Sequence, residues 1–497
     1  MSQTPFPLLE TTVERIHAAY RSGELTARAL VQGYLDRIAA YDKQGPALNA
    51  LISLNPTALE EADRLDAAWR ASGPVGPLHG IPMVMKDQGD VKGMPTTMGS
   101  VLFKDHNPGR DSSVVARLRA AGAIFLGKAT LGELGAGDTH GSLFGSTRNV
   151  YDLERTAGGS SGGSAVCVSA NFATLAVAQE GFASIRRPSI WNGVVGMRPT
   201  AGLVSRGGVY AGWPSINGSL GPMSRTVGDL ARMLDVMVGY DPLDPLSARG
   251  VGHVPESYTH GLDPNGLHGA RIGILREPMG YGTEPDSDDF AKIDAVFNQA
   301  VGELRTAGAT VVDPIEIPGL NELLAKRAGS TAEDEASFIE YFRGSANAPF
   351  ASRAEAMGSP LFQQVMIGAR SRWARETPAA AHHEYLMARE ELMTRLLDVM
   401  ADYRLDAIVH KAVEHQPTLI SQGVNPPYVD QKGAPHLNTF LVWVPSVVVP
   451  AGFTVDRLPA GITFLGRPYD DARMIRLAYA YEQATRHRRP PASVPEL

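Results

Sequence analysis

The stretch from Ala157 to Arg187 constrains the fold more than any other part of the chain. Its first fourteen residues contain eleven Gly, Ala or Ser, and Glu180 is the only charged residue between Ala157 and Ser184. Such a sequence forms little regular structure on its own, so its surroundings must hold the backbone in place. A flexible linker has a similar composition, but this run passes directly into the apolar sequence AVCVSANFATLAVA. We therefore expect it inside a packed domain, where its N–H groups and hydroxyls can approach a ligand.

The composition of the chain excludes several classes of protein. It has 497 residues, a net charge of −7 from 46 Lys plus Arg against 53 Asp plus Glu, and 43% hydrophobic residues, which excludes a disordered chain. The negative charge gives no electrostatic reason to bind nucleic acid or an anionic membrane. The single cysteine, Cys167, excludes an intramolecular disulfide and a Cys-based zinc site, and it suits a reducing compartment.

No targeting or membrane segment is expected. The N-terminal sequence MSQTPFPLLETTVERI lacks the basic leader and apolar stretch of a signal peptide. No part of the chain approaches the roughly 18 uninterrupted apolar residues of a membrane-spanning helix. We therefore predict a cytoplasmic enzyme with neither a nucleic-acid nor a membrane partner.

Hydrophobic periodicity predicts alternating helices and strands in the first part of the chain. Thr26 is a suitable N-cap for a helix whose apolar residues Leu30, Tyr34, Ile38 and Tyr41 recur at helical spacing. The same approach predicts a helix from about Pro56 to Ala71, ended by Gly73, and strands at Gly80–Asp87 and Ala121–Gly127.

A strand–helix–strand pattern follows in the second half. A strand at Ala270–Arg276, a helix carrying Phe290 to Leu304 and the strand ATVVDPIEI have the lengths of a βαβ unit, which predicts parallel pairing. The Gly-, Pro- and Asp-rich stretch Gly239–Gly269 is the expected linker between a core and a more variable lobe. The remaining predictions are mainly helical structure from about 320 to 402, strands at Asp406–His410 and Ser446–Val449, and a last helix capped by Asp470.

Three generic motifs give weak signals for function. Residues 158–162 satisfy G-x-S-x-G, but the nucleophile elbow of α/β-hydrolases needs a strand before it, and LERTAG does not resemble one. Residues 122–128 nearly match a P-loop, but AIFL is expected to be a strand and Ala129 follows the lysine. The histidines have no metal-ligand spacing, and the pair His382-His383 falls on an expected solvated helix. We predict no metal site.

Three further motifs occur in a fixed order along the chain. They are GIPMVMKD at 80–87, GGSSGGSA at 158–165 and Ser184-Ile185-Arg186. Together they resemble the lysine motif, the Gly/Ser motif and the nucleophile region of the amidase signature family. Longer segments match as well, such as NGVVGMRPTAGLVSRGGV, GPMSRTVGDLA and GITFLGRPYDDARMIRLAYAYEQATRHRRPP. The resemblance covers nearly the whole chain and is weakest from about 280 to 430.

The resemblance implies a Ser–Ser–Lys triad. Ser184 would be the nucleophile, Ser160 the bridging serine on a cis peptide, and Lys86 the base. Serine is a poor nucleophile without a base, and a lysine accepts a proton only when it is neutral. Burial would therefore have to lower the pKa of Lys86 from its ordinary value of about 10.4. The apolar run before Lys86 favours this, whereas Asp87 could oppose it.

The resemblance also implies an oxyanion hole made of backbone amides. These amides belong to Gly181, Phe182 and Ala183, together with that of Ser184. The family usually has Thr and two Gly at the first three positions, so this chain departs from the pattern. Phe182 brings a ring near the chemistry, where it could shape a pocket or be an ordinary core residue. The supporting residues implied are Ser161, Glu180 and Arg186, with Arg186 contacting the Gly/Ser loop or Glu180.

The resemblance assigns no catalytic role to Arg187 or to four aromatic residues of the chain. Arg187 replaces a residue that is usually smaller or apolar in the family, and no role can be assigned to it. Four aromatic residues are candidates for a substrate pocket, although core packing is the stronger expectation for each: Trp191, Tyr210, Trp213 and Trp443.

The fold implied by the resemblance is a single α/β domain over residues 1–497. A mixed central β-sheet would carry helices on both faces, with a more variable helical lobe. The core motifs would occupy about 75–235, the linker about 239–269, the lobe about 280–430 and the C-terminal return to the core about 440–490.

The function implied is cleavage of a carbon–nitrogen amide bond through an acyl-enzyme on Ser184. Aryl acylamides, carbamates (urethanes) and esters have the same carbonyl geometry, so they remain open as small-molecule substrates. The alternative is a glutaminase-type subunit that supplies ammonia to a partner in an amidotransferase complex. The altered sequence Gly-Phe-Ala before the nucleophile leans away from that role. No cofactor is expected, and a homodimer is one assembly that the resemblance allows.

Overall fold

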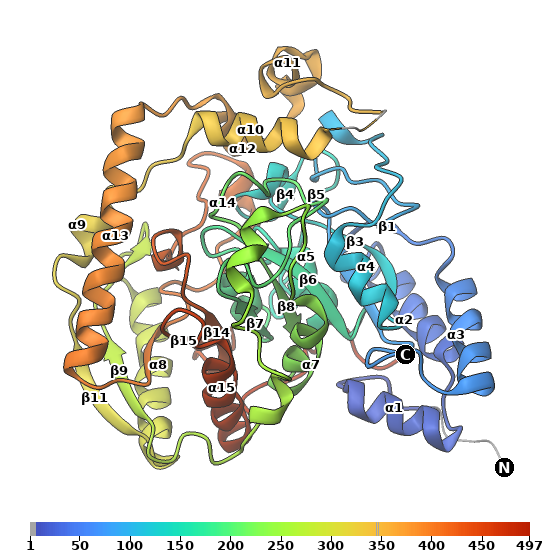
Figure 1. Ribbon diagram of the computed structural model, residues 1–497, viewed down its shortest axis with the longest axis horizontal. Helices are drawn as coiled ribbons and strands as arrows, with labels where there is room; N and C mark the ends of the chain where they lie inside the picture. The colour runs from blue at the N-terminus through green and yellow to red at the C-terminus, as the bar shows by residue number, and fades with distance from the viewer. Residues whose placement is uncertain (1–5, 344, 346) are drawn as a thin grey trace.

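One large mixed sheet forms the centre of the protein. The computed structural model describes residues 6–343, 345 and 347–497. We predicted from the N-terminal sequence that the chain has no signal peptide, and residues 1–5 of that sequence lie outside the described residues. The sheet has eleven strands in the order β1-β3-β2-β6-β8-β7-β14-β15-β12-β9-β11 (Figure 1). In that order they are Leu51–Leu54, Ile124–Ala129, Pro82–Lys86, Leu175–Glu180, Ser219–Ser224, Val195–Arg198, Ser446–Phe453, Pro459–Leu465, Ala407–Lys411, Arg271–Leu275 and Thr310–Ile315. The two-stranded pairs are β4 (His140–Gly141) with β5 (Gly145–Ser146), and β10 (Gly280–Tyr281) with β13 (Ala434–Pro435).

The sheet consists of two parallel groups joined by antiparallel strands, and β1 pairs antiparallel with β3 at one edge. Strand β2 is parallel to both β3 and β6, and β9 is parallel to both β11 and β12. The strands between the two groups pair antiparallel. Because β2 and β6 are parallel neighbours, their carboxyl ends meet at one edge of the sheet. Ligands of open α/β sheets usually bind at such an edge.

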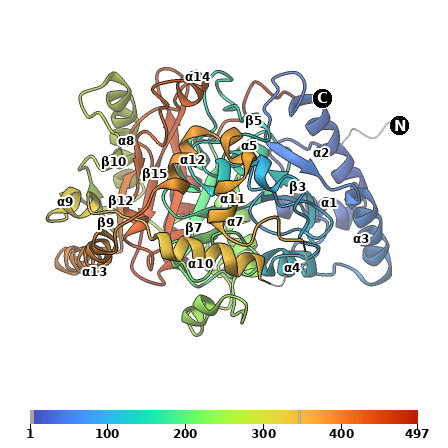
Figure 2. The same ribbon diagram turned by 90° about the horizontal axis from the view of Figure 1, so that it is seen from above.

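Helices flank this sheet on both faces. In one layer α4, α7, α15 and α8 contact one another in turn, and in the other α5 contacts α6 while both pack on the central strands (Figure 1). Helices α10 to α12 lie across the top of the view in Figure 1 and over the middle of the molecule in Figure 2. The helices are α1 (Val13–Ser22), α2 (Ala27–Tyr41), α3 (Ala58–Ser72), α4 (Ser113–Ala120), α5 (Gly162–Ser169), α6 (Arg186–Trp191), α7 (Val227–Met237), α8 (Asp288–Thr306), α9 (Leu320–Leu324), α10 (Thr331–Phe342), α11 (Arg353–Gly358), α12 (Ile367–Ala374), α13 (Ala379–Asp402), α14 (Ile420–Val424) and α15 (Asp471–Thr485). Short 3₁₀ helices lie at Val101–Phe103, Glu133–Gly135, Pro245–Gly250, Thr259–Gly261, Pro360–Gln364 and Leu437–Thr439.

Most of the predicted elements are present, and the α/β fold is confirmed. Thr26 caps α2 with its side-chain oxygen, which accepts from the backbone N–H of Ala29, and β9 and β11 are parallel as the βαβ pattern predicted. The strand predicted at 121–127 begins three residues later, because Ala121 caps α4 and Gly122 turns the chain at φ +94°. Strand β8 was missed because its sequence, SLGPMS, contains glycine and proline.

The predicted linker packs against the core. Arg206 and Asp244 form a buried ion pair, with the Arg206 Nε 2.9 Å from an Asp244 oxygen, and Tyr258 is buried. The division of the chain into core, linker and lobe therefore stays a prediction.

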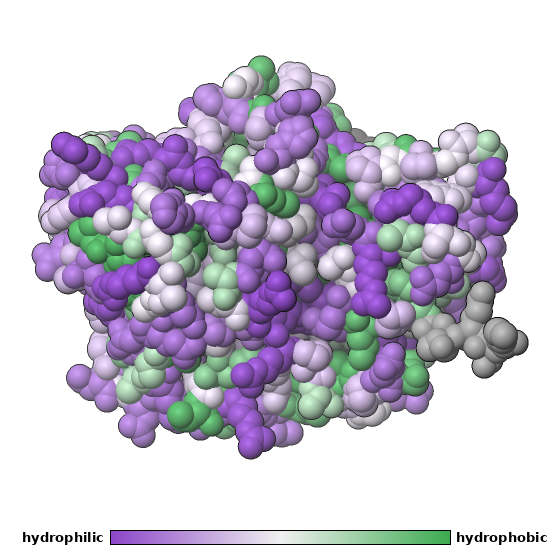
Figure 3. Space-filling view, turned by 90° about the horizontal axis from the view of Figure 1, so that it is seen from below, coloured by the Kyte–Doolittle hydropathy of each residue, from purple (hydrophilic) through white to green (hydrophobic). Residues whose placement is uncertain are grey.

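In the part of the chain that the structure describes, no helix is both long and apolar enough to cross a membrane. On the face seen in Figure 3, hydrophobic side chains are scattered among hydrophilic ones.

Candidate active site

Lys86, Ser160 and Ser184 form one chain of polar contacts at the carboxyl edge of β2 and β6. The ammonium nitrogen of Lys86 lies 2.7 Å from the Ser160 hydroxyl oxygen, which lies 2.9 Å from the hydroxyl oxygen of Ser184. Lys86 also donates to the carbonyl oxygen of Gln179 at 3.2 Å. Lys86 and Ser160 are each 1% exposed, whereas Ser184 is 8% exposed. The serine at the end of the chain is thus the one that a substrate could reach.

The surroundings of Lys86 favour its neutral form. Burial lowers the pKa of Lys86 to about 7, and the negative charge of Glu180 opposes this shift. The sequence pointed to Asp87 as the opposing charge. That expectation is wrong, because Asp87 lies 2.8 Å from the buried ammonium of Lys128 and accepts from Thr97. Lys128, the lysine of the sequence that nearly matches a P-loop, is therefore a structural partner of Asp87 in strand β3.

The loop that carries Ser160 is packed against a second loop. The Gly159–Ser160 peptide bond is cis, and the Ser160 hydroxyl lies 2.8 Å from the carbonyl oxygen of Gly135. A Cβ atom on Gly159 would come within 2.3 Å of the carbonyl oxygen of Gly137. Glycine at position 159 is therefore required by this close approach of two backbones. The N–H of Ser161 donates to the carbonyl oxygen of Ser184 at 3.2 Å and joins the loop to the nucleophile turn.

A single carboxylate organises the turn before Ser184. One oxygen of Glu180 accepts from the backbone N–H groups of Ile185 and Arg186 at 2.8 and 3.0 Å, and the other accepts from the Arg186 Nε at 2.7 Å. The guanidinium of Arg186 also donates to the carbonyl oxygen of Phe182 at 3.0 Å. The contact between Arg186 and Glu180 is one of the two that the resemblance implied for this arginine.

The amides implied as an oxyanion hole are available as donors. Among the described residues, the backbone N–H groups of Gly181, Phe182, Ala183 and Ser184 have no hydrogen-bond acceptor in the protein. Gly181, Phe182 and Ala183 all lie outside the left-handed region of φ, so the side chains of Phe182 and Ala183 cause no backbone strain. The departure from the family pattern therefore leaves the N–H groups free.

The ring of Phe182 lies among residues from distant parts of the chain. His436 stacks on it with ring centres 5.0 Å apart and planes at 11°, the guanidinium carbon of Arg327 lies 4.5 Å from the ring centre, and Tyr281 packs at 6.1 Å in an edge-on arrangement. Burial lowers the pKa of His436 to about 4. Phe182 therefore contributes to an aromatic wall beside the nucleophile turn.

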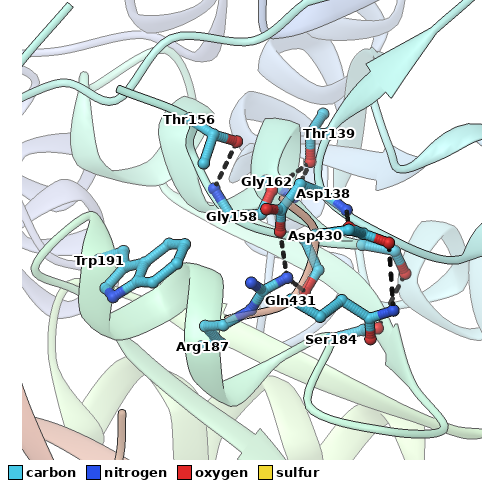
Figure 4. Close-up of polar contacts among 12 residues, drawn as sticks. Asp138, Thr139, Thr156, Gly158, Gly162, Ser184, Arg187, Trp191, Asp430 and Gln431 are labelled. Carbon is cyan, nitrogen blue, oxygen red and sulfur yellow. Dashed lines mark hydrogen bonds and ion pairs between the residues drawn. The ribbon is translucent and has the colours of Figure 1, made fainter. Parts of the chain in front are cut away.

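Arg187 has a definite place that the sequence did not reveal. Its guanidinium forms a buried ion pair with Asp138, which Figure 4 shows together with the neighbouring Trp191. The same guanidinium donates to the carbonyl oxygen of Gly159 at 3.2 Å. Asp430 accepts from the backbone N–H of Asp138 at 2.7 Å. The sequence contained only a weak indication of this ion pair: Arg187 is a charged residue in a segment that must be buried, and such a residue requires a partner.

The remaining predicted residues differ in their surroundings. The Ser161 hydroxyl lies 3.2 Å from the carbonyl oxygen of Gln179. Trp191 and Tyr210 are buried in hydrophobic clusters, in line with the core-packing expectation. Trp213 is 37% exposed, and Trp443 packs under the guanidinium of Arg249. Within the described residues no group of three or more His, Cys, Asp or Glu side chains could hold a metal ion.

Comparisons with known proteins agree with these observations. The family model described as Amidase matches residues 29–475. A glutamyl-tRNA(Gln) amidotransferase subunit of Symbiobacterium thermophilum is 33% identical over 95% of this chain and 96% of that protein. The peptide amidase of Stenotrophomonas maltophilia has a TM-score of 0.86 at 36% identity, covering 98% of this chain and 99% of that one. A bacterial aryl acylamidase of the amidase signature enzymes has a TM-score of 0.79 at 25% identity, covering 96% and 97%.

The chain is similar to these proteins both in sequence and in fold. The match includes the strands that carry Lys86 and the turn before Ser184, and it extends over residues 280–430, where the sequence motifs are weakest. The chain belongs to the amidase family and is an amide-hydrolysing enzyme.

Proposed function

We propose that the protein hydrolyses amide bonds with Ser184 as nucleophile and Lys86 as base, acting through Ser160. The observation that carries this proposal is the contact chain of 2.7 and 2.9 Å that ends on a lysine with a pKa of about 7. At neutral pH a large share of Lys86 is uncharged and can accept a proton. An ordinary lysine would be almost fully protonated at this pH.

The first half-reaction forms an ester on the enzyme. Ser184 Oγ attacks the carbonyl carbon while its proton moves to Ser160 Oγ, and the proton of Ser160 moves to Lys86 Nζ. The negative charge that develops on the carbonyl oxygen is stabilised by the free N–H groups of Gly181, Phe182 and Ala183, since such donors are each worth about 10²–10³ in rate. The carbon–nitrogen bond then breaks, and the nitrogen takes its proton from Lys86 through Ser160.

The second half-reaction uses the same groups on water. Lys86, neutral again, accepts a proton through Ser160 from a water molecule that attacks the acyl carbon. Collapse of the second tetrahedral intermediate releases the acid and returns the proton to Ser184 Oγ. Besides the substrate and one water molecule, these steps use only side chains and backbone N–H groups of the chain.

The aromatic wall around Phe182 supports anilides and aryl carbamates as substrates. Flat aromatic groups pack well against rings such as those of Phe182, His436 and Tyr281. A free glutamine would need partners for its ammonium and carboxylate groups, and the guanidinium of Arg327 on the Phe182 ring would repel the ammonium. We therefore favour an amidase that acts alone on small aryl amides or carbamates.

A glutaminase subunit is the second candidate. It is supported by the identity to the glutamyl-tRNA(Gln) amidotransferase subunit of Symbiobacterium thermophilum over nearly the full length of both chains. The expectation that this chain has no nucleic-acid partner stays a prediction, since that relative is named for work on a tRNA.

Two measurements test the proposal. Initial rates of the purified chain on anilides, aryl carbamates, aliphatic amides and glutamine separate the candidates: anilide or carbamate cleavage without glutaminase activity supports the first, and glutaminase activity alone supports the second. Ser184→Ala should abolish both turnover and labelling by a fluorophosphonate, while its melting temperature stays that of the wild type. Labelling that persists in this variant would remove Ser184 as the nucleophile.

A further inference from the structure

A small cavity lies behind the Ser160 loop, and its lining combines a cluster of charged side chains with a larger apolar part that includes Met366, Ile367 and Val429. Its volume is about 40 Å³, and Glu133, Asp138, His140, Arg372 and Asp430 contribute to its wall. A water molecule needs roughly 10–15 Å³ by this measure, so the cavity has room for two or three ligands of that size. None of the proposed catalytic groups lines it.

Two buried polar atoms of this wall have no partner in the protein. One carboxylate oxygen of Asp138 pairs with Arg187, but the other has no hydrogen bond among the described residues. The Nε2 atom of His140 is likewise without a partner, while its Nδ1 lies 2.8 Å from the Ser146 hydroxyl. Asp138 is 4% and His140 is 7% exposed. Buried polar atoms without partners are costly, so a ligand that pairs with both atoms would be stabilised here.

These two atoms call for a ligand that donates hydrogen bonds. A carboxylate oxygen can only accept, and Nε2 of a neutral imidazole accepts when Nδ1 carries the proton. Burial lowers the pKa of His140, which favours the neutral ring. The wall also holds three carboxylates, from Glu133, Asp138 and Asp430, against the guanidinium of Arg372 and that of Arg187 behind Asp138. A small cation with N–H donors matches both the atoms and the charge.

The cavity shares a wall with the proton path. The Ser160 hydroxyl lies 2.8 Å from the carbonyl oxygen of Gly135, and the next three residues, up to Asp138, line the cavity. Gly159 packs on the same segment, since a Cβ atom there would lie 2.9 Å from the Cα atom of Asp138. The nitrogen that leaves the substrate must take its proton from Ser160, and therefore departs close to this segment.

We propose that this cavity binds the released nitrogen, as ammonium or as the ammonium form of a small primary amine, through Asp138 and His140. The inference rests on the proposed function only for the origin of the ligand, because binding itself can be measured without turnover. Asp430 and Arg372 are partly exposed, so the ligand would leave the cavity on their side.

The experiment compares ammonium chloride with tetramethylammonium chloride at equal ionic strength. Tetramethylammonium has the same charge but no N–H group, and equal ionic strength removes the effect of screening. Ammonium at about ten times its dissociation constant should raise the melting temperature of the wild type by about 1–3 °C more than tetramethylammonium does. Ammonium should also inhibit hydrolysis in a saturable way.

Two variants and one control locate the binding. Asp138→Asn and His140→Phe each remove one acceptor and should weaken ammonium binding about tenfold or more. Asp244→Asn is the matched control, because it disturbs another buried Arg–Asp pair, that of Arg206, outside the cavity. It should leave ammonium binding unchanged.

The outcomes separate this inference from the proposed function. Equal responses of the wild type to the two salts would overturn the inference, as would unchanged ammonium binding in whichever of the two variants folds. If neither variant folds, the wild type still tests the inference, because equal responses to ammonium and tetramethylammonium would contradict it. Ammonium binding without any amide hydrolysis would instead contradict the proposed function while leaving the cavity as an ammonium site.

Discussion

Arg186 and Arg187 are neighbours in the chain, but they stabilise two different regions. Arg186 pairs with Glu180, six residues away, and both belong to the turn that carries Ser184. Arg187 pairs with Asp138, which is 49 residues away, and donates to Gly159 in the loop that carries Ser160. Both ion pairs are buried and have almost no exposed side-chain area.

The difference shows that the two serines are held in different ways. The nucleophile turn is a local structure, because Glu180 accepts both from its own turn's backbone and from Arg186. The Ser160 loop depends on distant parts of the chain, since Gly135, Asp138 and Asp430 belong to other segments. Lys86 touches both regions, through its contact with Ser160 and the charge of Glu180.

Among the substitutions that test this comparison, removal of Lys86 should give the largest effect. We expect Lys86→Met to lower kcat/KM by about 10²–10⁴, the usual range for a general base. Unfolded lysine keeps its proton up to about pH 10.4, whereas folded Lys86 loses it near pH 7. The unfolded state therefore binds more protons between these values, and this lysine's contribution to wild-type stability increases with pH. Lys86→Met should lack that slope and be at least as stable as the wild type at pH 7, as measured by urea unfolding.

Lys128→Met is the matched control for this prediction. Lys128 is also a buried lysine, but it is paired with Asp87. Its removal leaves a buried carboxylate without its partner, which typically costs about 3–5 kcal/mol. A loss of that size in Lys86→Met as well would contradict a neutral, unpaired Lys86.

Substitution of the two arginines tests the comparison itself. Arg186→Met and Arg187→Met each leave a buried carboxylate uncompensated, so each should lower the free energy of unfolding by about 3–5 kcal/mol. Arg187→Met should also lower kcat, by about tenfold, while fluorophosphonate labelling of Ser184 stays measurable, because the turn of Ser184 is intact. Arg186→Met should slow both turnover and labelling.

Arg187→Lys supplies the rescue. A lysine restores the charge opposite Asp138 but cannot donate to Asp138 and Gly159 with the fork geometry of a guanidinium. It should recover most of the lost stability and only part of kcat. If it recovers neither, Arg187 has a role beyond its pair with Asp138.

The pH dependence distinguishes the charge of Glu180 from its hydrogen bonds. Turnover by the wild type should rise with pH through about 7, because the neutral form of Lys86 is the base. The negative charge of Glu180 raises the pKa of Lys86, so Glu180→Gln should move this limb of the kcat profile to lower pH, even though the turn is weakened and kcat falls. An unshifted limb in Glu180→Gln would show that Glu180 acts only as a structural brace.

The sequence predicted the elements that repeat a simple pattern and the residues that match a motif. The helix capped by Thr26 and the parallel pair β9 and β11 follow from hydrophobic spacing alone. Lys86, Ser160 and Ser184 could be brought together only through the resemblance, because Lys86 and Ser184 are 98 positions apart and no local sequence pattern indicates their contact.

The parts that sequence could not supply are those that depend on tertiary contacts. Asp138 meets Arg187 and Asp430 across 49 and 292 residues, and no local pattern indicates such partners. Asp87 was assigned the wrong effect because neighbours in sequence need not interact, and here Lys128 occupies its carboxylate. The free amides at 181–183 depend on backbone angles, which Phe182 and Ala183 adopt without strain.

Substitution of the two glycines nearest the serines should have opposite results. Gly181→Ala should give the smallest effect on activity, and Gly159→Ala should give a large one. A Cβ atom on Gly181 would meet nothing closer than the carbonyl oxygen of Asn217 at 3.8 Å, and its φ suits any residue. Gly181→Ala should therefore keep kcat/KM within about twofold, since the N–H group is retained. A Cβ atom on Gly159 would lie 2.3 Å from the carbonyl oxygen of Gly137, so Gly159→Ala must move the Ser160 loop and lose most activity. Similar losses in both variants would mean that the nucleophile turn is as tightly packed as the loop, and that its amides need glycine after all.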